Sequence, residues 1–334
     1  MQGYNAIGTK NAVNGERGRE MVKYSLKRLA QSLITLFIII TVVFLLMRLM
    51  PEEGYFGAAY EKLDEAQREA ILTSMGLRDP MHIQLKNFYK SLLSGDLGKS
   101  IIYRPKVPIA EILKTKIPYS LYFGLTAMAI SLIAGVSLGI VMARSKSKLW
   151  DKLGTGYIVF INAVPAAVYY LFLQLYVTDI FKLPILFKPD KPVSWILPAI
   201  SMSLGSTASY AMWMRRYMVD ELNKDYVKLA RAKGLKNKAI MAKHIFRNAF
   251  VPMAQYLPTS LLYTISGSIY IESLYSIPGM GGLLVDVIQR QDNTLVQALV
   301  LIYSSIGIIG LFLGDVLMAI FDPRINLQKK GGAR

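Results

Sequence analysis

The segment of this chain that decides its fold reads Asp225-Tyr226-Val227-Lys228-Leu229-Ala230-Arg231-Ala232-Lys233-Gly234. It is polar and basic, and it lies between two strongly apolar stretches, residues 195–214 and 251–273. When a membrane protein keeps a long basic stretch between two spans, that stretch usually lies on the cytoplasmic side. The segment therefore predicts an integral membrane protein with a cytoplasmic loop over residues 215–250.

The composition agrees with a membrane location. Of the 334 residues, 53% are hydrophobic, and the mean hydropathy is positive. The net charge is +17, and the charged residues lie between the apolar runs. This distribution favours loops that face anionic lipid and argues against nucleic-acid binding. The chain has no cysteine, which excludes disulfides and thiolate metal sites. Its two histidines, His82 and His244, are far apart, which argues against a metal or catalytic site built on histidine.

Six apolar runs have the length of a membrane span. They cover residues 29–50, 119–143, 155–177, 195–214, 251–273 and 296–320. The expected fold class is therefore an all-α integral membrane protein with six transmembrane helices. Pro165, Pro198 and Pro258 interrupt three of these runs, where they mark either bends that line a cavity or kinks that neighbouring helices tolerate.

Basic residues indicate how the spans are oriented. Lys23, Lys27 and Arg28 precede the first span, and ten Lys or Arg residues lie in the loop over 215–250. The connection between the second and third spans and the segment after the sixth are also basic. Since basic loops stay in the cytoplasm, both termini are expected there, with the long segment 51–118 outside.

The expected organisation follows the spans. It consists of an unfolded polar tail at 1–20, a first span within 21–50, an extracellular helical segment at 51–118, a five-helix core at 119–325 and a cytoplasmic tail at 326–334. Within the extracellular segment, residues 61–75 and 81–93 favour short helices, with Gly76 as a stop and Pro80 before the restart.

One motif resembles a nucleotide-binding loop without meeting its requirements. Gly95-Asp96-Leu97-Gly98-Lys99-Ser100 ends like a P-loop, but the position of the earlier glycine is Leu93 and no buried strand precedes it. We expect no nucleotide at this motif, so if the protein carries out active transport, the energy has to come from another polypeptide.

The loop continues with Leu235, Lys236 and the run from His244 to Pro252, and further short motifs follow along the chain. They are Gly76-Leu77-Arg78-Asp79-Pro80, Gly95 to Ser100, Lys106-Val107-Pro108, Glu272 with Pro278-Gly279-Met280-Gly281-Gly282, and Asp315 with Asp322-Pro323-Arg324-Ile325. In this order the chain resembles, over residues 21–325, the permease subunits of oligopeptide-, dipeptide- and nickel-type ABC importers. Its long outer segment resembles the first of the two permeases in such systems.

The resemblance implies a type I importer permease that works by alternating access. It implies as partners a second homologous permease, two cytoplasmic ATP-binding subunits, an extracytoplasmic substrate-binding protein and membrane lipid. ATP and Mg would be bound by the partner ATPases, and this chain would hold no cofactor and be no enzyme. The implied cargo is a short peptide, with nickel or an oligosaccharide as alternatives.

The loop itself predicts two short helices joined by a glycine. Residues 221–233 favour a helix with Leu222, Tyr226, Leu229 and Ala230 on one face, Gly234 permits the turn that ends it, and Asn237 would cap a second helix at 238–249. By resemblance, this compact unit contacts the ATPase. The implied contact residues are Asp225, Tyr226, Leu229, Ala230, Arg231, Ala232, Lys233, Gly234, Leu235 and Arg247.

Two alternatives remain open from the residues alone. The loop could lie on anionic lipid as a basic interfacial helix. The whole protein could be an autonomous secondary transporter or channel, which would place ionisable residues near mid-membrane. Arg48, Glu272 and Asp315 lie within or beside spans, where snorkelling or a pathway role would explain them.

Overall fold

The computed structural model describes the backbone of residues 3–254, 257, 260 and 269–321. Within this part the chain is helical, apart from loops and an isolated antiparallel bridge between Lys99 and Pro108. Most of the predicted fifth span, together with Pro258, Asp322, Pro323, Arg324 and the tail at 326–334, lies outside the described residues.

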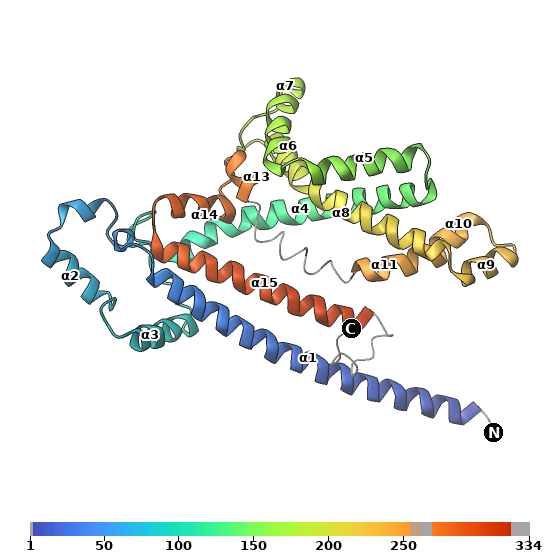
Figure 1. Ribbon diagram of the computed structural model, residues 1–334, viewed down its shortest axis with the longest axis horizontal. Helices are drawn as coiled ribbons and strands as arrows, with labels where there is room; N and C mark the ends of the chain where they lie inside the picture. Colours follow the sequence, from blue (N-terminus) through green and yellow to red (C-terminus); the bar gives the residue numbers. More distant parts are fainter. Residues whose placement is uncertain (1–2, 255–256, 258–259, 261–268, 322–334) are drawn as a thin grey trace.

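Two pairs of long helices form the body of the molecule (Figure 1). The first pair is α1 (Gly3–Arg48) beside α15 (Asn293–Phe321), and the second is α4 (Ile109–Arg144) beside α8 (Ile196–Leu222). By length and hydropathy, three described helices could cross a membrane: Val22–Arg48, Ile109–Arg144 and Asn293–Val316. A bent helix pair could add a fourth span, compared with the six predicted.

The α4–α8 pair is close because two glycines on α4 remove side chains from its interface. A Cβ added at Gly135 would lie 2.7 Å from the carbonyl oxygen of Thr207, and one at Gly139 would lie 2.7 Å from that of Ala211. Small residues four positions apart let membrane helices approach closely.

The predicted third span is broken near its middle. Helix α5 (Leu149–Ala163) ends at Val164, and α6 (Ala166–Phe172) then leaves at 110°. The cause is Pro165, because the residue before a proline is pushed out of the helical region, and Val164 is extended with φ −89° and ψ 131°. A short π-helical segment (Leu173–Val177) and α7 (Thr178–Phe181) continue α6 away from the body.

Helix starts differ from the expectations at two further places. Residues 1–20 were expected to be unfolded, whereas α1 begins at Gly3, since extending an existing helix avoids the cost of nucleation. Helix α4 begins at Ile109 and continues through Pro118, ten residues before the predicted span.

The segment over residues 51–118 contains the two helices expected from its sequence. Two short 3-10 helices, Glu52–Tyr55 and Gly57–Lys62, precede α2 (Glu65–Ser74), which starts later than predicted because Asp64 caps it in a capping box with Gln67. Gly76 has a φ of +70°, and α3 (Met81–Leu93) follows Pro80. Helix α3 packs on α1 through Phe88 and Phe44, whose ring centroids are 4.8 Å apart.

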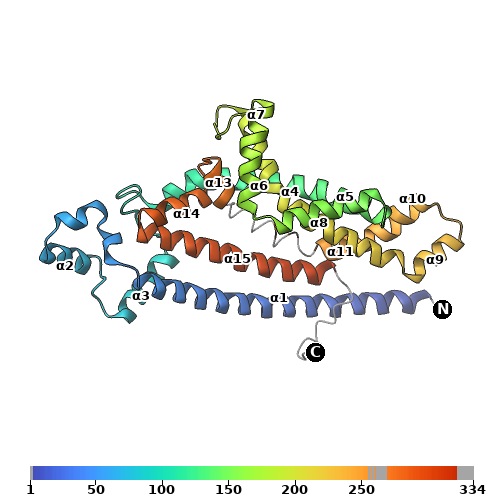
Figure 2. The same ribbon diagram turned by 45° about the horizontal axis from the view of Figure 1, so that its top comes forward.

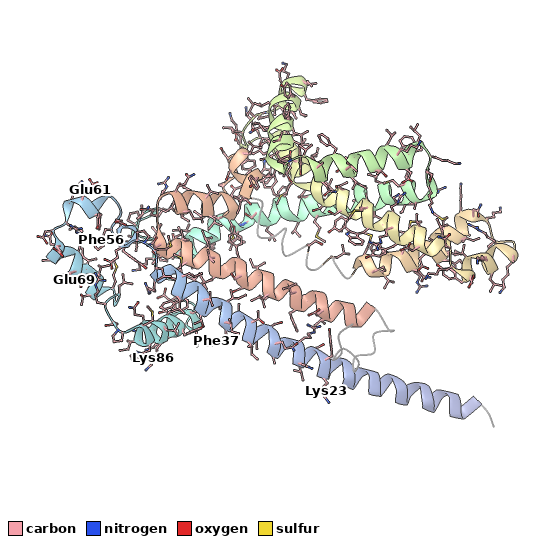
Figure 3. All side chains as sticks on the ribbon, viewed as in Figure 1. Lys23, Phe37, Phe56, Glu61, Glu69 and Lys86 are labelled. Atoms are coloured by element: carbon pink, nitrogen blue, oxygen red, sulfur yellow. The ribbon has the colours of Figure 1, made fainter. Side chains whose placement is uncertain are left out.

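The loop over residues 215–250 lies at the opposite end of the molecule from this segment. It contains α9 (Asp225–Ala232), α10 (Asn237–Ala239), a π-helical segment (Ile240–Phe246) and α11 (Arg247–Ala254). Figure 2 shows α2 and α3 at one end of the long helices and α9 and α10 at the other. In Figure 3, Glu61 and Glu69 mark the first end, whereas Lys23 lies toward the other end of α1.

Two short helices precede α15, which is the last described helix. Helix α13 (Ile269–Leu274) and α14 (Met280–Gln289) are joined by the Pro-Gly-x-Gly turn. A further 3-10 turn, Pro192–Trp195, leads into α8.

Candidate functional site

The loop between α8 and α11 forms a compact projection, which we call the coupling knob and define as residues 225–236. Its helix α9 buries Val227, which is fully buried, and Ala230. These two side chains pack in a hydrophobic cluster with Met214 and Met218 of α8 and with Ile240 and Ile245 beyond the turn. The knob is therefore fixed on the end of α8.

The predicted helix over 221–233 is wrong in one respect: it is interrupted. Helix α8 ends at Leu222, and α9 starts at Asp225 after a new N-cap at Lys224. The interruption resets the helical register, so Val227 and Ala230 face inward while Leu229 is 57% exposed. Tyr226 joins the two pieces, because its hydroxyl donates to the Glu221 carboxylate.

Gly234 ends α9 as the sequence predicted. Its φ is +75°, the Leu235 amide donates to the Ala230 carbonyl over 3.2 Å, and the Gly234 amide donates to the Arg231 carbonyl over 2.9 Å. This is a glycine C-cap with hydrogen bonds of the Schellman type. Asn237 is the first residue of α10 rather than its cap, a position held by Lys236.

The outer surface of the knob combines apolar and basic side chains. Leu229 and Leu235 are 57% and 44% exposed. The other exposed candidate residues are Asp225, Arg231, Ala232, Lys233 and Gly234, with Arg247 at the start of α11. Asp225 pairs with Lys228 over 2.8 Å on the solvent side.

A second site, the Glu272 cluster, lies where α13 meets α14. It comprises Glu272, Ser120 and the first amides of α14. Glu272 is buried, and its Oε2 accepts from the amides of Gly281 at 2.7 Å and Gly282 at 3.1 Å. Ser120 of α4 donates to Oε1 over 2.7 Å and accepts from the Met280 amide over 2.8 Å.

This cluster gives the Pro278-Gly279-Met280-Gly281 motif a physical role. A carboxylate at a helix N-terminus satisfies amides that have no partner within the helix. A Cβ on Gly279 would lie 2.3 Å from Glu272 Oε2 and 2.6 Å from Ser120 Oγ. The glycine thus leaves the space in which the carboxylate and hydroxyl meet α14.

A third site, the Asp292 cluster, joins the start of α15 to the loop after the Gly-Asp-Leu-Gly motif. Asp292 is fully buried. Its Oδ2 accepts from Ser100 Oγ at 2.6 Å and from the Ile102 and Tyr103 amides at 3.0 Å each, and its Oδ1 accepts from the Leu295 amide at 3.2 Å. It therefore caps α15 and binds the loop together.

Burial opposes ionisation of Asp292, but the hydrogen bonds from Ser100 and from the backbone amides outweigh it. The pKa of this carboxyl is consequently lowered below its ordinary value. The carboxylate of Asp292 is stabilised by donors from two segments distant in sequence, residues 100–103 and Leu295.

The Gly95–Ser100 motif does not have P-loop geometry. It follows helix α3 rather than a strand, and its Lys99 forms the isolated bridge with Pro108. Gly95 and Gly98 have φ values of +76° and +82°, and Asp96 Oδ1 accepts from the Gly98 amide over 2.8 Å. The motif is thus a turn that leads Ser100 to Asp292.

Asp315 is paired, not merely placed near a helix end. Its carboxylate lies 3.2 Å from the Arg28 guanidinium, which links α15 to α1. Arg48 lies at the other end of α1, where it donates to the Tyr55 hydroxyl over 3.0 Å.

Three buried polar residues were not predicted from the sequence: Ser120, Asp151 and Asp292. Asp151 accepts through its Oδ2 from the Arg215 guanidinium over 2.8 Å. Asp292 carried a signal, because an aspartate directly before an apolar helical run is a typical N-cap. Ser120 carried none, since its partner Glu272 lies 152 residues away in the chain.

The long apolar helices and the closely packed α4–α8 pair are those of a multi-pass membrane protein. The chain belongs to the family described as the binding-protein-dependent transport system inner membrane component, whose model matches residues 135–327. The model for the N-terminal part of such membrane components matches residues 21–105.

Individual relatives extend over nearly the full chain. The dipeptide transport system permease protein DppB of Lactococcus lactis subsp. cremoris is 32% identical over 92% of this chain and 100% of its own length. The glutathione transport system permease protein GsiC of Pectobacterium atrosepticum is 31% identical over 92% of this chain and 100% of its own. The oligopeptide transport system permease protein AmiC of Streptococcus pneumoniae is 39% identical over 63% of this chain, but only 42% of AmiC.

Proposed function

We propose that this chain is one of two permease subunits of an ABC importer of short peptides and that the coupling knob receives the movement of a cytoplasmic ATP-binding subunit. The observation that carries the proposal is the division of α9 into two faces. One face is fixed to α8 through Val227 and Ala230, and the other exposes Leu229 beside basic residues.

Such a surface suits a partner with an apolar socket and an acidic rim. Apolar anchors at the centre of an interface supply affinity, and charges at its edge supply orientation. Since the buried cluster under the knob includes Met214 and Met218 of α8, a displacement of the knob would move α8, which packs on α4.

Membership of this family supports the proposed partners. The assembled importer would contain a second homologous permease, two cytoplasmic ATP-binding subunits that hold ATP and Mg, and an extracytoplasmic substrate-binding protein. The chain would cross the cell membrane six times with both termini in the cytoplasm. The transport roles named for DppB, AmiC and GsiC favour dipeptides, oligopeptides or a glutathione-like peptide over nickel or an oligosaccharide.

The decisive variant for the coupling role is Gly234→Val. A Cβ at Gly234 would meet no atom within 4 Å, so the first added carbon has room, but the β-branched side chain of valine disfavours the observed φ of +75°. We expect normal membrane insertion, weaker association with the ATP-binding subunit and at least tenfold slower peptide uptake into proteoliposomes that contain the assembled importer.

The matched control is Gly156→Ala on α5, which also has open space around it but no positive φ. Normal uptake and normal ATPase association in Gly234→Val would refute the coupling role. The cargo is tested in the same vesicles with a labelled dipeptide, competed separately by unlabelled dipeptide, nickel chloride and an oligosaccharide.

A further inference from the structure

A cavity of about 290 Å³ lies where α4 ends, at the end of the molecule that carries α9 and α10 (Figure 1). Arg144, the last residue of α4, and Lys238 of α10 line it together with apolar side chains. The apolar lining consists of Ile140, Met218, Met241, Ala242 and Phe246. The volume is roughly ten times that of a water molecule in the liquid, so the cavity can hold a small polar group with part of an apolar chain.

Both charges of this cavity are positive. None of its lining residues is acidic, and neither Arg144 nor Lys238 forms an ion pair with an acid in the part of the chain that the structure describes. Both residues are exposed, so an incoming group can reach their side chains. Two cations that border one apolar space attract an anion, because the anion offsets the repulsion between them.

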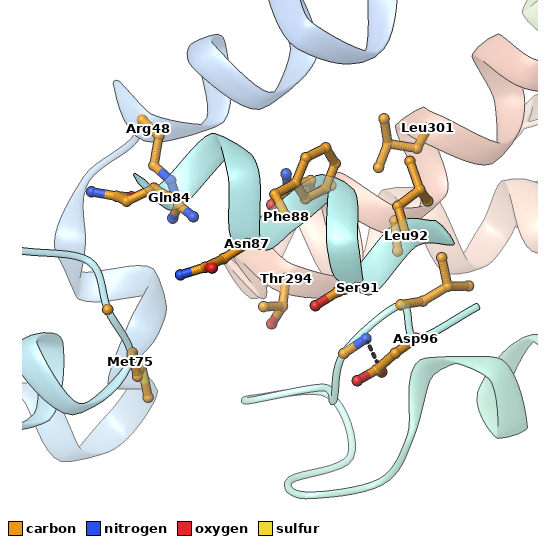
Figure 4. Close-up of a pocket in the computed structure, with 15 residues that line it drawn as sticks. Arg48, Met75, Gln84, Asn87, Phe88, Ser91, Leu92, Asp96, Thr294 and Leu301 are labelled. Atoms are coloured by element: carbon orange, nitrogen blue, oxygen red, sulfur yellow. Dashed lines mark hydrogen bonds between the residues drawn. The ribbon is translucent and has the colours of Figure 1, made fainter. Parts of the chain in front are cut away.

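The cavity at the other end of the molecule differs in its charge. It has a volume of about 240 Å³ and lies between α3 and the start of α15. Figure 4 shows Arg48 and Asp96 in its lining, one charge of each sign. That lining selects for no net charge, whereas the lining beside Arg144 selects for an anion.

Helix α4 indicates what the rest of the anion looks like. This helix is long and apolar enough to cross a membrane, and it ends at Arg144. Ile140 lies one turn before Arg144, and Ile133, which is 72% exposed, lies two turns before Ile140 on the same helix face. The cavity is therefore the end of an apolar strip on a helix that can cross a membrane, at the depth where lipid headgroups begin.

We propose that this cavity binds an anionic phospholipid. Its phosphate is bound by Arg144 through paired N–H groups of the guanidinium and by Lys238 as a point charge. The glycerol and the first carbons of one acyl chain lie against Ile140 and Ala242, and the chain continues along α4 toward Ile133. The site differs from the general attraction of basic loops to lipid, because it combines cations from α4 and α10 with one apolar cavity.

Bound lipid also supports the coupling knob. The π-helical segment Ile240–Phe246 contributes Met241 and Ala242 to the cavity, whereas its Ile240 and Ile245 pack in the cluster under the knob. A lipid in the cavity therefore stabilises this segment against α4. This support rests on the proposed function of the knob, but the binding of lipid does not.

The test is titration of the purified full chain in a non-ionic detergent with dioleoyl phosphatidylglycerol, with bound lipid counted by native mass spectrometry. We expect one saturable site per chain and a higher melting temperature when the lipid is present. Dioleoyl phosphatidylcholine carries a cation that would meet Arg144 and Lys238, and glycerol phosphate lacks the acyl chains. Each should therefore bind at least tenfold more weakly.

Two pairs of variants separate this cavity from unspecific attraction. Arg144→Gln and Lys238→Gln each remove one cation at an exposed position, and each should weaken binding about tenfold without lowering the melting temperature of the lipid-free chain. The matched controls are Lys146→Gln and Lys243→Gln, which remove a nearby exposed cation that does not line the cavity. Both controls should bind the lipid like the native chain.

Ala242→Asp tests the cavity by adding a charge instead of removing one. Ala242 is exposed, so the surface can accommodate aspartate, and its carboxylate places a negative charge in the lining. We expect this variant to bind no phosphatidylglycerol at concentrations that saturate the native chain, because the carboxylate repels the phosphate and neutralises a cation.

The proposal is overturned if phosphatidylglycerol binds no more tightly than phosphatidylcholine, if glycerol phosphate binds as tightly as the lipid, or if the control variants weaken binding as much as Arg144→Gln and Lys238→Gln. Normal lipid binding by these two variants, together with lost co-purification of the ATP-binding subunit, would also overturn it and assign the cations to that subunit. Lipid binding needs neither ATP nor a partner, so its failure is distinguishable from failure of peptide uptake in proteoliposomes.

Discussion

Two buried carboxylates, Glu272 and Asp292, bind backbone amides at the starts of α14 and α15. Each also accepts from a serine that lies more than 150 residues away, Ser120 and Ser100 respectively. At the residue scale, these two side chains hold the starts of α14 and α15 to segments distant in sequence through several converging hydrogen bonds.

The Glu272 cluster should not tolerate a methyl group at Gly279. In Gly279→Ala, the new Cβ would overlap Glu272 Oε2, so we expect a loss of about 1–3 kcal/mol in stability and reduced transport. Thermal melting of the purified protein in detergent measures the change. Gly156→Ala, where a Cβ meets open space, should leave the melting temperature unchanged or raise it.

The Asp292 cluster should make stability depend on acid. Because the folded protein lowers the pKa of Asp292 below 3.8, the ionised carboxylate stabilises the fold fully at pH well above 3.8. This contribution is lost as the pH falls through 3.8 toward the lower folded value. Asp292→Asn should therefore melt lower than the native protein at about pH 6, and the difference should shrink toward about pH 3.

The control for this comparison is Asp190→Asn, on an exposed loop. It should follow the native curve throughout. Equal melting temperatures for the native protein and Asp292→Asn at pH 6 would show that the cluster contributes no stability.

At the scale of single elements, α9 illustrates how a short helix can have separate structural and interaction faces. Its buried face holds Val227 at the core of the knob, and its exposed face carries Leu229 two residues later. A helix places residues two apart on different faces, so the two roles can be tested separately.

We expect Val227→Ala and Leu229→Ala to have opposite profiles. Val227→Ala leaves a cavity and should destabilise the loop by about 2 kcal/mol. Leu229→Ala removes exposed surface and should leave stability unchanged while weakening association with the ATP-binding subunit. Melting and co-purification measure the two effects, and a Leu229→Ala complex that assembles and transports normally would contradict the assignment of the exposed face.

At the scale of the whole molecule, the long helices place two functional ends far apart. The α2–α3 segment lies at one end and the coupling knob at the other (Figure 1). The Arg28–Asp315 pair connects α1 to α15 on the knob side, and the α3–α1 aromatic contact connects the segment over residues 51–118 to the same helix.

This arrangement predicts the sidedness of two exposed lysines. The chain has no cysteine, so Lys86→Cys and Lys233→Cys each introduce a single thiol. An impermeant thiol reagent added to intact cells should label the first and not the second, and breaking the membrane should expose the second. Labelling of Lys86→Cys only after the membrane is broken would contradict the predicted orientation.

The sequence by itself determined the features that depend on local physics. The apolar runs predict the positions of α1, α4 and α15. The helix-forming residues between Gly76 and Leu93 predict α3, and Gly234 predicts the turn after α9. These follow from hydrophobic periodicity and backbone preference, which act over a few residues.

Only the tertiary structure decided the features that depend on distant partners or on helix register. It set the 110° break at Pro165, the burial of Val227 in place of Leu229, and the meeting of Ser100 with Asp292 across 192 positions. A local sequence pattern cannot specify such meetings, because the free energy that selects them comes from packing and hydrogen bonds between segments far apart in the chain.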